Sequence, residues 1–119
     1  DQQELARFYL DRARRLVDQE QDREAAAELN RVLFLAPYDA DAHLLLGRIS
    51  LRAGRTSEAI DALKIAVWSR DTADTRVALG EAYLAAREPA AARAEAEKAL
   101  ALAPGHGGAT ALLQRIAGR

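Results

Sequence analysis

The chain has 119 residues, half of them hydrophobic, which is enough to bury the core of one modest domain. Its 17 basic and 18 acidic residues are interleaved, giving a formal net charge of −1 and no basic stripe, so a nucleic-acid partner is not expected. Cysteine is absent, which excludes disulfides and thiolate metal sites and leaves the compartment open between cytoplasm and periplasm.

No apolar run approaches the roughly 18 residues of a membrane-spanning helix, and no signal peptide is visible, so membrane insertion is not expected. The chain begins at Asp1 and contains no methionine, which we interpret as the mark of a processed product or a fragment of a longer protein. Its abundant alanine, and its excess of arginine over lysine, favour a bacterial source.

The first hairpin is predicted from two helical segments. Apolar residues recur at intervals of three and four over residues 5–19, which predicts an amphipathic helix. A second helix, with Asp22 as its candidate N-cap, ends before Pro37. The short polar connection between the two helices makes them antiparallel neighbours.

The second hairpin follows directly. Asp39 is placed to cap its first helix, Gly54 to close that helix, and Thr56 or Ser57 to begin the next. The polar run after Trp68 breaks the fourth helix. Each helix has too narrow an apolar stripe to stand alone, so neighbouring hairpins must cover it.

The third hairpin covers residues 73–103, with Pro89 in the first turn of its second helix and Pro104 ending that helix. A glycine-rich loop follows, in which His106 is expected to be solvated. A short last helix over residues 109–117 has an apolar side that must lie on the third hairpin, which brings the number of predicted helices to seven.

The three hairpins repeat one another. Leu46 and Gly47 of the second recur as Leu79 and Gly80 of the third, and three places in the alignment hold matching, mostly small residues. These residues are Ala13, Gly47 and Gly80; Ala25, Ala59 and Ala92; and Val32, Ala66 and Ala99. The pattern resembles the tetratricopeptide repeat, a helix–turn–helix unit of about 34 residues with glycine, alanine and a late proline at set places.

The resemblance implies an all-α fold, a right-handed α–α superhelix of three hairpins with a C-terminal capping helix. One domain is expected over residues 1–119, with repeats over 6–39, 40–72 and 73–106. Glycine costs about 1 kcal/mol inside a helix, so Gly47 and Gly80 are expected where two helices cross closely. Packing explains these small residues, and we assign them no chemical role.

Catalytic chemistry is not indicated anywhere in the sequence. The two histidines, His43 and His106, lie far apart without a second ligand at helical spacing, and His43 is expected to pack between helices. Acidic pairs such as Asp39 with Asp41 lie at helix starts, where negative charge is favoured. No phosphate loop or nucleophile motif is found, so we predict no enzyme activity, catalytic residue, cofactor or metal.

Trp68 lies at the end of the fourth predicted helix, in a repeat that is one residue shorter than its neighbours and has Asp71 where proline is expected. Trp68 either fills the apolar slot left by Ser69, where the other repeats have Leu35 and Leu102, or is an exposed anchor for a partner. We favour the first interpretation.

In tetratricopeptide arrays the first helix of each hairpin lines a concave groove, so the resemblance implies which residues meet a partner. They form two apolar tracks with charged residues between them. The set consists of Leu10, Arg14, Val17, Leu44, Arg48, Leu51, Arg52, Val77, Glu81 and Leu84. Across neighbouring helices the expected ion pairs are Arg7–Asp41, Asp18–Arg52 and Arg48–Glu81, which leaves Arg14 least satisfied.

Carboxylate-clamp members of this family hold heat-shock chaperone tails with basic or amide side chains at five groove positions. Here those positions hold Leu10, Arg14, Leu45, Asp74 and Ala78. Only Arg14 fits, so a chaperone tail is not the expected partner.

The resemblance therefore implies a non-enzymatic interaction module that binds a peptide or helix segment of a protein partner in its groove. The alternative is a structural spacer, or a self-associating segment of a longer repeat protein. An exposed Leu112 or Leu113 on the last helix would favour this alternative, and a polar outer face there would favour a capped adaptor.

Overall fold

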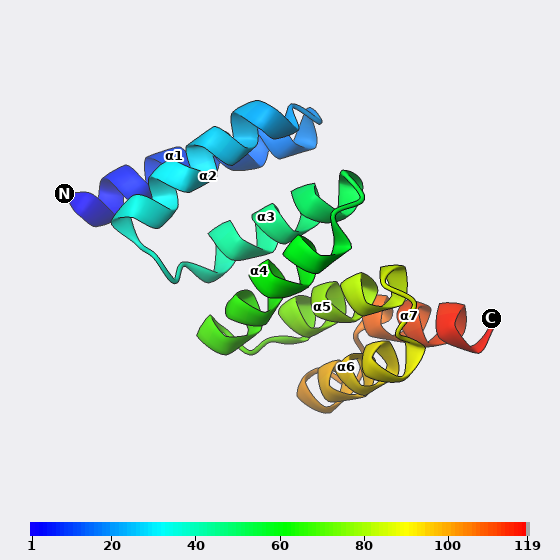
Figure 1. Ribbon diagram of the computed structural model, residues 1–119. Coiled ribbons are helices and arrows are strands. Elements are labelled where there is room, and N and C mark those ends of the chain that lie inside the picture. The colour runs from blue at the N-terminus through cyan, green and yellow to red at the C-terminus, as the bar shows by residue number, and fades with distance from the viewer. Residues whose placement is uncertain (119) are drawn as a thin grey trace.

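The computed structural model describes residues 1–118, which form seven α-helices and no strand. The helices are α1 Gln2–Asp18, α2 Asp22–Leu35, α3 Ala40–Arg52, α4 Thr56–Ser69, α5 Ala73–Ala85, α6 Pro89–Leu102 and α7 Gly107–Ala117. Consecutive helices pair as hairpins that stack along the 45 Å axis of the molecule, with the two termini at opposite ends (Figure 1). The all-α solenoid of three hairpins and a last helix, predicted from the sequence, is confirmed.

Local sequence signals explain most helix ends. The Asp39 carboxylate accepts a hydrogen bond from the Ala42 amide at 2.9 Å and caps α3, while Pro89 is the first residue of α6. Gly54 has φ +80° just beyond α3, a conformation that glycine adopts without steric cost. The prediction that Asp22 caps α2 is wrong. Asp22 is the first helical residue, and its carboxylate accepts hydrogen bonds from Arg52 instead.

Each hairpin buries its apolar side against the next one. Leu10, Leu29 and Ile49, from α1, α2 and α3, belong to one buried cluster, and a second buried cluster joins α4 to α5. A Cβ atom added to Gly47 would lie 2.5 Å from Cγ of Leu63. The expected close helix crossings are therefore confirmed, since no real Cβ tolerates such a contact.

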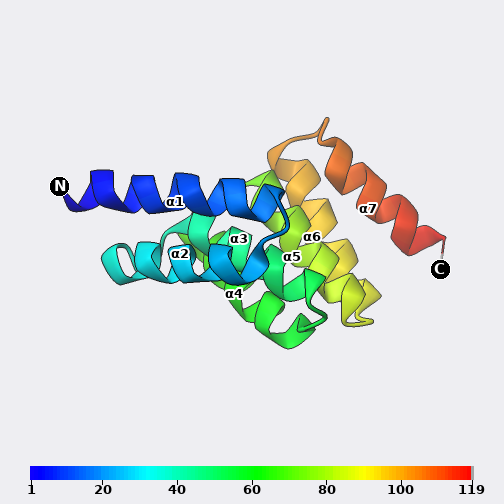
Figure 2. The same ribbon diagram turned by 90° about the horizontal axis from the view of Figure 1, so that it is seen from above.

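The last helix begins at Gly107, two residues earlier than predicted. His106 is its N-cap and is not a solvated loop residue: its ring Nδ1 accepts a hydrogen bond from the Ala109 amide at 3.1 Å. Nδ1 is therefore unprotonated, and Nε2 carries the proton that it donates to Asp74 Oδ1 at 2.6 Å. This bond ties the start of α7 to α5, and α7 then runs beside the third hairpin toward the C-terminus (Figure 2).

His43 packs between helices as expected. Its side chain is buried, and its ring Nε2 donates a hydrogen bond to the carbonyl oxygen of Pro37 at 2.9 Å. The bond fixes the connection between α2 and α3. Across residues 1–118, no helix has the length and apolar character needed to cross a membrane.

Candidate protein-binding surface

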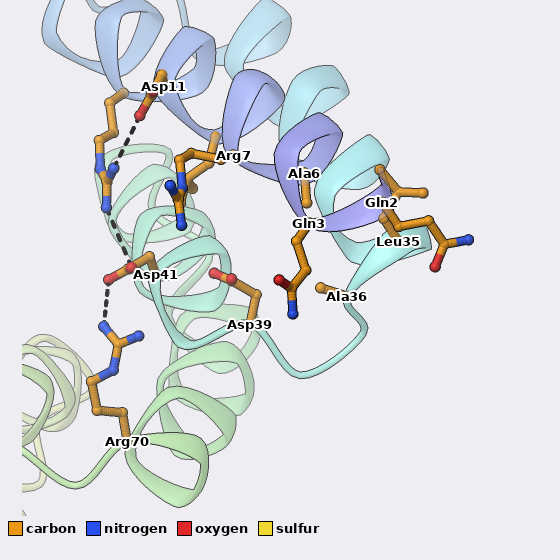
Figure 3. A pocket seen from close by; sticks show the side chains of 12 residues that line it. Gln2, Gln3, Ala6, Arg7, Asp11, Leu35, Ala36, Asp39, Asp41 and Arg70 are labelled. Carbon is orange, nitrogen blue, oxygen red and sulfur yellow. Dashed lines mark hydrogen bonds and ion pairs between the residues drawn. The ribbon is translucent and has the colours of Figure 1, made fainter.

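An open cavity of about 720 Å³ lies between the N-terminal half of α1 and the start of α3 (Figure 3). Leu10 and Arg14, both predicted groove residues, line it from α1 together with Arg7. Asp41 lines it from α3, and Arg70 from the connection after α4. The sequence prediction missed Arg70 because it lies outside the first helices of the repeats.

A chain of ion pairs crosses one side of this cavity. The Arg14 guanidinium contacts Asp11 Oδ1 and Asp41 Oδ2, each at 3.3 Å, and Arg70 donates to Asp41 Oδ1 at 3.0 Å (Figure 3). Two guanidinium groups already hold the Asp41 carboxylate, so the predicted Arg7–Asp41 pair does not form. Arg14 is one of the better satisfied cations of this surface, contrary to the prediction.

Arg7 is the cation that the structure leaves available in the cavity. Its side chain is exposed, points from α1 toward α3 (Figure 3), and forms no ion pair with any residue of the described chain. Binding a carboxylate there would require no existing ion pair to break. Arg48 on α3 is also exposed and, within residues 1–118, also lacks an ion pair.

The two other predicted charged residues tie helices together. Arg52 donates to Asp22 from Nε at 2.9 Å and from Nη2 at 2.6 Å, and Nη2 also contacts the carbonyl oxygen of Val17 at 3.3 Å. The hydrogen bonds to Asp22 raise the pKa of Arg52. Glu81 pairs with Arg115 of α7 at 3.3 Å. The predicted pairs Asp18–Arg52 and Arg48–Glu81 are therefore wrong.

The predicted apolar tracks divide into two classes. Leu44 and Leu51 of α3 are half-buried and pack against the cluster between α4 and α5, so part of each side chain meets solvent. The others have exposed fractions of only 2 to 8% and contribute mainly to the core; they are Leu10, Val17, Val77 and Leu84. Arg7 and Arg48 are exposed and lack an ion pair within residues 1–118, and Leu44 and Leu51 are partly open to solvent; we call these four residues the groove surface.

Trp68 does not fill a slot in the core, contrary to the favoured interpretation. Its side chain is 74% exposed, and its ring packs edge-to-face on Tyr38 with centroids 5.4 Å apart. The supposed slot is not a core position, since Leu102 occupies it in the third repeat and is 52% exposed. In the second repeat Ser69 bonds there to the carbonyl oxygen of Tyr38 at 2.6 Å.

Tyr38 and Trp68 line a second, smaller cavity of about 330 Å³ together with Lys64 and Ile65 of α4. Trp68 is exposed, as the alternative interpretation requires, and its role as an anchor for a partner stays a prediction. Sequence reasoning gave Tyr38 no role, although its place directly after Pro37 in a short connection indicates an exposed aromatic residue. Nowhere in residues 1–118 do three or more His, Cys, Asp or Glu side chains converge as metal ligands would.

A family model described as tetratricopeptide repeat matches residues 10–75, more than half of the chain. A search of curated proteins finds no match.

Several solved structures are similar to this chain. The first tetratricopeptide domain of Spaghetti (RPAP3), bound to the HSP90 peptide SRMEEVD, is 20% identical with a TM-score of 0.90, covering 99% of this chain and 94% of that one. The Arabidopsis OM64 tetratricopeptide domain is 15% identical, with a TM-score of 0.91 and coverage of 99% and 98%. MamA is 24% identical, with a TM-score of 0.82 and coverage of 95% and 62%. At these identities the similarity shows the fold alone.

Proposed function

We propose that this chain, which belongs to the tetratricopeptide repeat family, binds a polypeptide segment of a partner along the groove surface, without catalysis, cofactor or metal. The observation that carries the proposal is the cavity of about 720 Å³ between α1 and α3, which Arg7 of the groove surface lines with a guanidinium that forms no ion pair within residues 1–118. A cavity of this size accommodates several side chains of an extended or helical segment.

The chemistry of the groove surface defines the segment that would fit. Leu44 and Leu51 offer accessible apolar area, while Arg7 and Arg48 offer positive charge that no acidic group of the described chain neutralises. Apolar contacts would supply most of the affinity, and the arginines would select acidic residues and fix the register. The proposed partner segment therefore combines apolar anchors with carboxylates.

A heat-shock chaperone tail remains an unfavourable candidate. The RPAP3 domain is bound to the HSP90 peptide SRMEEVD, but in this chain most positions of a carboxylate clamp lack the basic or amide side chains that hold such a tail. Leu45 and Ala78 are apolar and buried, and Asp74 brings a carboxylate that accepts the hydrogen bond from His106. The Asp74 carboxylate would repel the carboxylates of such a tail.

Self-association is the second candidate function, and the two ends of the array bear on it differently. At the C-terminal end Leu112 is 1% exposed and Leu113 is half-buried, which favours a capped array. At the N-terminal end Leu5 and Phe8 of α1 are 43% and 53% exposed, and another copy could cover them. Sedimentation of the parent and of a Phe8→Ser variant tests this candidate, which predicts a concentration-dependent mass that the substitution removes.

The groove proposal is tested by selecting binding segments from a displayed library of random peptides. We expect the selected segments to be rich in apolar and acidic residues, and the double variant Arg7→Glu with Arg48→Glu to bind them at least about tenfold more weakly. Its circular dichroism spectrum and melting temperature should stay close to those of the parent, since exposed charge changes seldom alter stability much.

The matched control carries the same change of net charge on the second helices of the hairpins. Arg23 of α2 and Arg93 of α6 are both exposed, so Arg23→Glu with Arg93→Glu should bind the selected segments as the parent does. Equal loss in both double variants would mean that net charge alone matters. Loss only in the control would move the binding site to the opposite face and overturn the proposal.

A further inference from the structure

We infer that the cavity formed by Tyr38, Lys64, Ile65 and Trp68, here called the aromatic notch, is a second protein-binding site that takes one bulky apolar side chain followed by an acidic residue. The notch lies outside the groove surface and involves none of its residues. The inference goes beyond the proposed function, because it assigns a different surface and a different recognition element.

Two aromatic side chains stand at the notch without being covered. Tyr38 is 63% exposed and Trp68 is 74% exposed, although each ring contacts the other edge-to-face. The place in the first repeat that corresponds to Trp68 holds Phe34, which is 87% exposed, whereas the third repeat has Ala101. Exposed aromatic residues are therefore confined to the first two hairpins. Trp and Tyr are also the residues that most often dominate the energy of protein interfaces.

The notch is held in shape before any partner arrives. Ser69 Oγ donates to the carbonyl oxygen of Tyr38 at 2.6 Å, and His43 Nε2 donates to that of Pro37 at 2.9 Å. Asp39, the next residue, is fixed as the N-cap of α3. Because the backbone on both sides of Tyr38 is anchored, a partner would lose little affinity to ordering this surface.

The positive charge of Lys64 distinguishes between two kinds of ligand for the aromatic rings, a cation and an apolar side chain next to an acidic residue. Rings of this kind often bind cations, but Lys64 lines the notch and would repel one. Lys64 forms no ion pair within the part of the chain that the structure describes, so its ammonium group is available to a carboxylate. The complementary ligand is an apolar side chain next to an acidic residue.

Size argues against a second copy as the occupant. The notch has a volume of about 330 Å³ and four lining residues, whereas a stable protein–protein interface uses about 20 to 30 residues on each side. A single large side chain of a peptide segment and its neighbour match these dimensions.

The single tryptophan of the chain makes the inference directly testable, since Trp68 alone supplies the indole fluorescence. The probe is an acetylated and amidated peptide of glycine and serine with one central phenylalanine followed by two glutamates. We expect a saturable blue shift of Trp68 emission at millimolar peptide. Replacing the phenylalanine of the peptide by alanine, or its glutamates by lysines, should weaken binding about tenfold or more.

Variants of the protein separate the contributions. Tyr38→Ala should weaken binding while leaving the helical circular dichroism spectrum intact, and Lys64→Glu should reverse the preference to the lysine-containing peptide. The groove variant Arg7→Glu with Arg48→Glu should keep the full fluorescence response, so failure of the groove proposal leaves this test standing.

Three outcomes would overturn the inference. One is the absence of a saturable shift, and another is a shift that Lys64→Glu leaves unchanged for both charged peptides. The third is a shift that depends on protein concentration without peptide, accompanied by dimerisation in sedimentation, which would make a second copy the occupant.

Discussion

The second hairpin carries His43 where the third hairpin carries Arg76, and the two residues do the same work by different chemistry. His43 is a buried side chain that donates to the carbonyl oxygen of Pro37 in the connection before its hairpin. Arg76 donates to Asp71, in the connection before its own hairpin, at 2.7 and 2.9 Å. Both residues anchor the chain as it passes from one hairpin to the next.

Arg76 also bonds the second helix of its own hairpin. Its Nη1 donates to both carboxylate oxygens of Glu95 on α6, at 3.0 and 3.2 Å, and Glu95 has a side chain only 7% exposed. Asp71 and Glu95 together raise the pKa of Arg76. The connection before the third hairpin is therefore held by a charged network, whereas the connection before the second is held by hydrogen bonds from His43 and Ser69 to backbone carbonyl oxygens. The connection that leads into a hairpin can thus be held by ion pairs or by hydrogen bonds to backbone carbonyl oxygens.

The largest difference between these hairpins is in what covers them. On its C-terminal side the second hairpin is covered by α5 of the third, whereas the third is covered on that side by the single helix α7. Leu112 of α7 is 1% exposed, so Leu112→Asp should bury a carboxylate without a partner, cost about 4 kcal/mol of unfolding free energy and release α7. Urea denaturation measures the cost, and size-exclusion chromatography detects the aggregation expected from the uncovered Leu84 and Ala96.

The neighbouring residue provides the control for that change. Ala111 lies on the exposed side of the same helix, so Ala111→Asp should stay within about 0.5 kcal/mol of the parent. A Leu112→Asp protein that remains monomeric with parental stability would show that α7 is not a cap.

Glycine at the helix crossing is common to both hairpins, and Gly47 has the closer neighbour. Because a Cβ there would lie 2.5 Å from Leu63, Gly47→Leu should cost about 3 kcal/mol although leucine is the better helix former. Gly105 has open space around it, so Gly105→Leu should have little effect on the same urea curves. Parental stability of Gly47→Leu would contradict the helix crossing described.

Removing the charged anchor tests the third hairpin specifically. Arg76→Ala leaves Glu95 buried without its main partner, and we expect a loss of about 2 kcal/mol in unfolding free energy. The double variant Arg76→Leu with Glu95→Leu should recover much of this loss, because an apolar pair leaves no buried charge unpaired. A double variant no more stable than Arg76→Ala would mean that packing around Arg76 matters more than its charge.

The second and third hairpins also differ in the residue that takes a positive φ in the turn between their two helices. The second hairpin turns at Gly54 with φ +80°, and the third turns at Arg87 with φ +64°. Only glycine adopts this conformation without steric cost, so Arg87→Gly should stabilise the protein by about 1 kcal/mol. Arg87→Ala keeps the steric cost and serves as the control in thermal melts. A gain of similar size in both variants would assign the effect to the lost arginine side chain.

Helix positions and repeat register could be predicted because their signals are local. Gly54, Asp39 and Pro89 each act within one turn of their own helix, and the sequence shows them without knowledge of the neighbours. Which predicted groove residues are accessible was less predictable, since a position such as Leu10 is buried or exposed according to how the next hairpin lies against it.

Ion pairs and Trp68 could not be predicted for a related reason. Arginine has a long, flexible side chain, so the choice of Asp41 by Arg14, or of Asp22 by Arg52, depends on the distances between separate helices. Trp68 was assigned to the slot left by Ser69 because the other repeats have Leu35 and Leu102 there, but Ser69 itself donates a hydrogen bond to the carbonyl oxygen of Tyr38 from that place.

The smallest expected effect is a pH dependence confined to the third hairpin. The hydrogen bonds from Arg76 hold the pKa of Asp71 below its ordinary value of about 4, so Asp71 favours folding fully above that value. The contribution is lost as the pH falls through the lower pKa of the folded state. The melting temperature of Asp71→Asn should therefore lie below that of the parent at pH 7 and converge with it in acid.

The measurement compares melting temperatures of parent and variant at a series of pH values in low salt, where such a partly exposed pair is least screened. Asp61 on α4 is exposed and, in residues 1–118, has no ion pair, so Asp61→Asn should track the parent at every pH. A gap that stays constant from neutral to acid would contradict the ionic anchor, and would make the third hairpin resemble the second, where His43 anchors the connection through a bond to a backbone carbonyl oxygen.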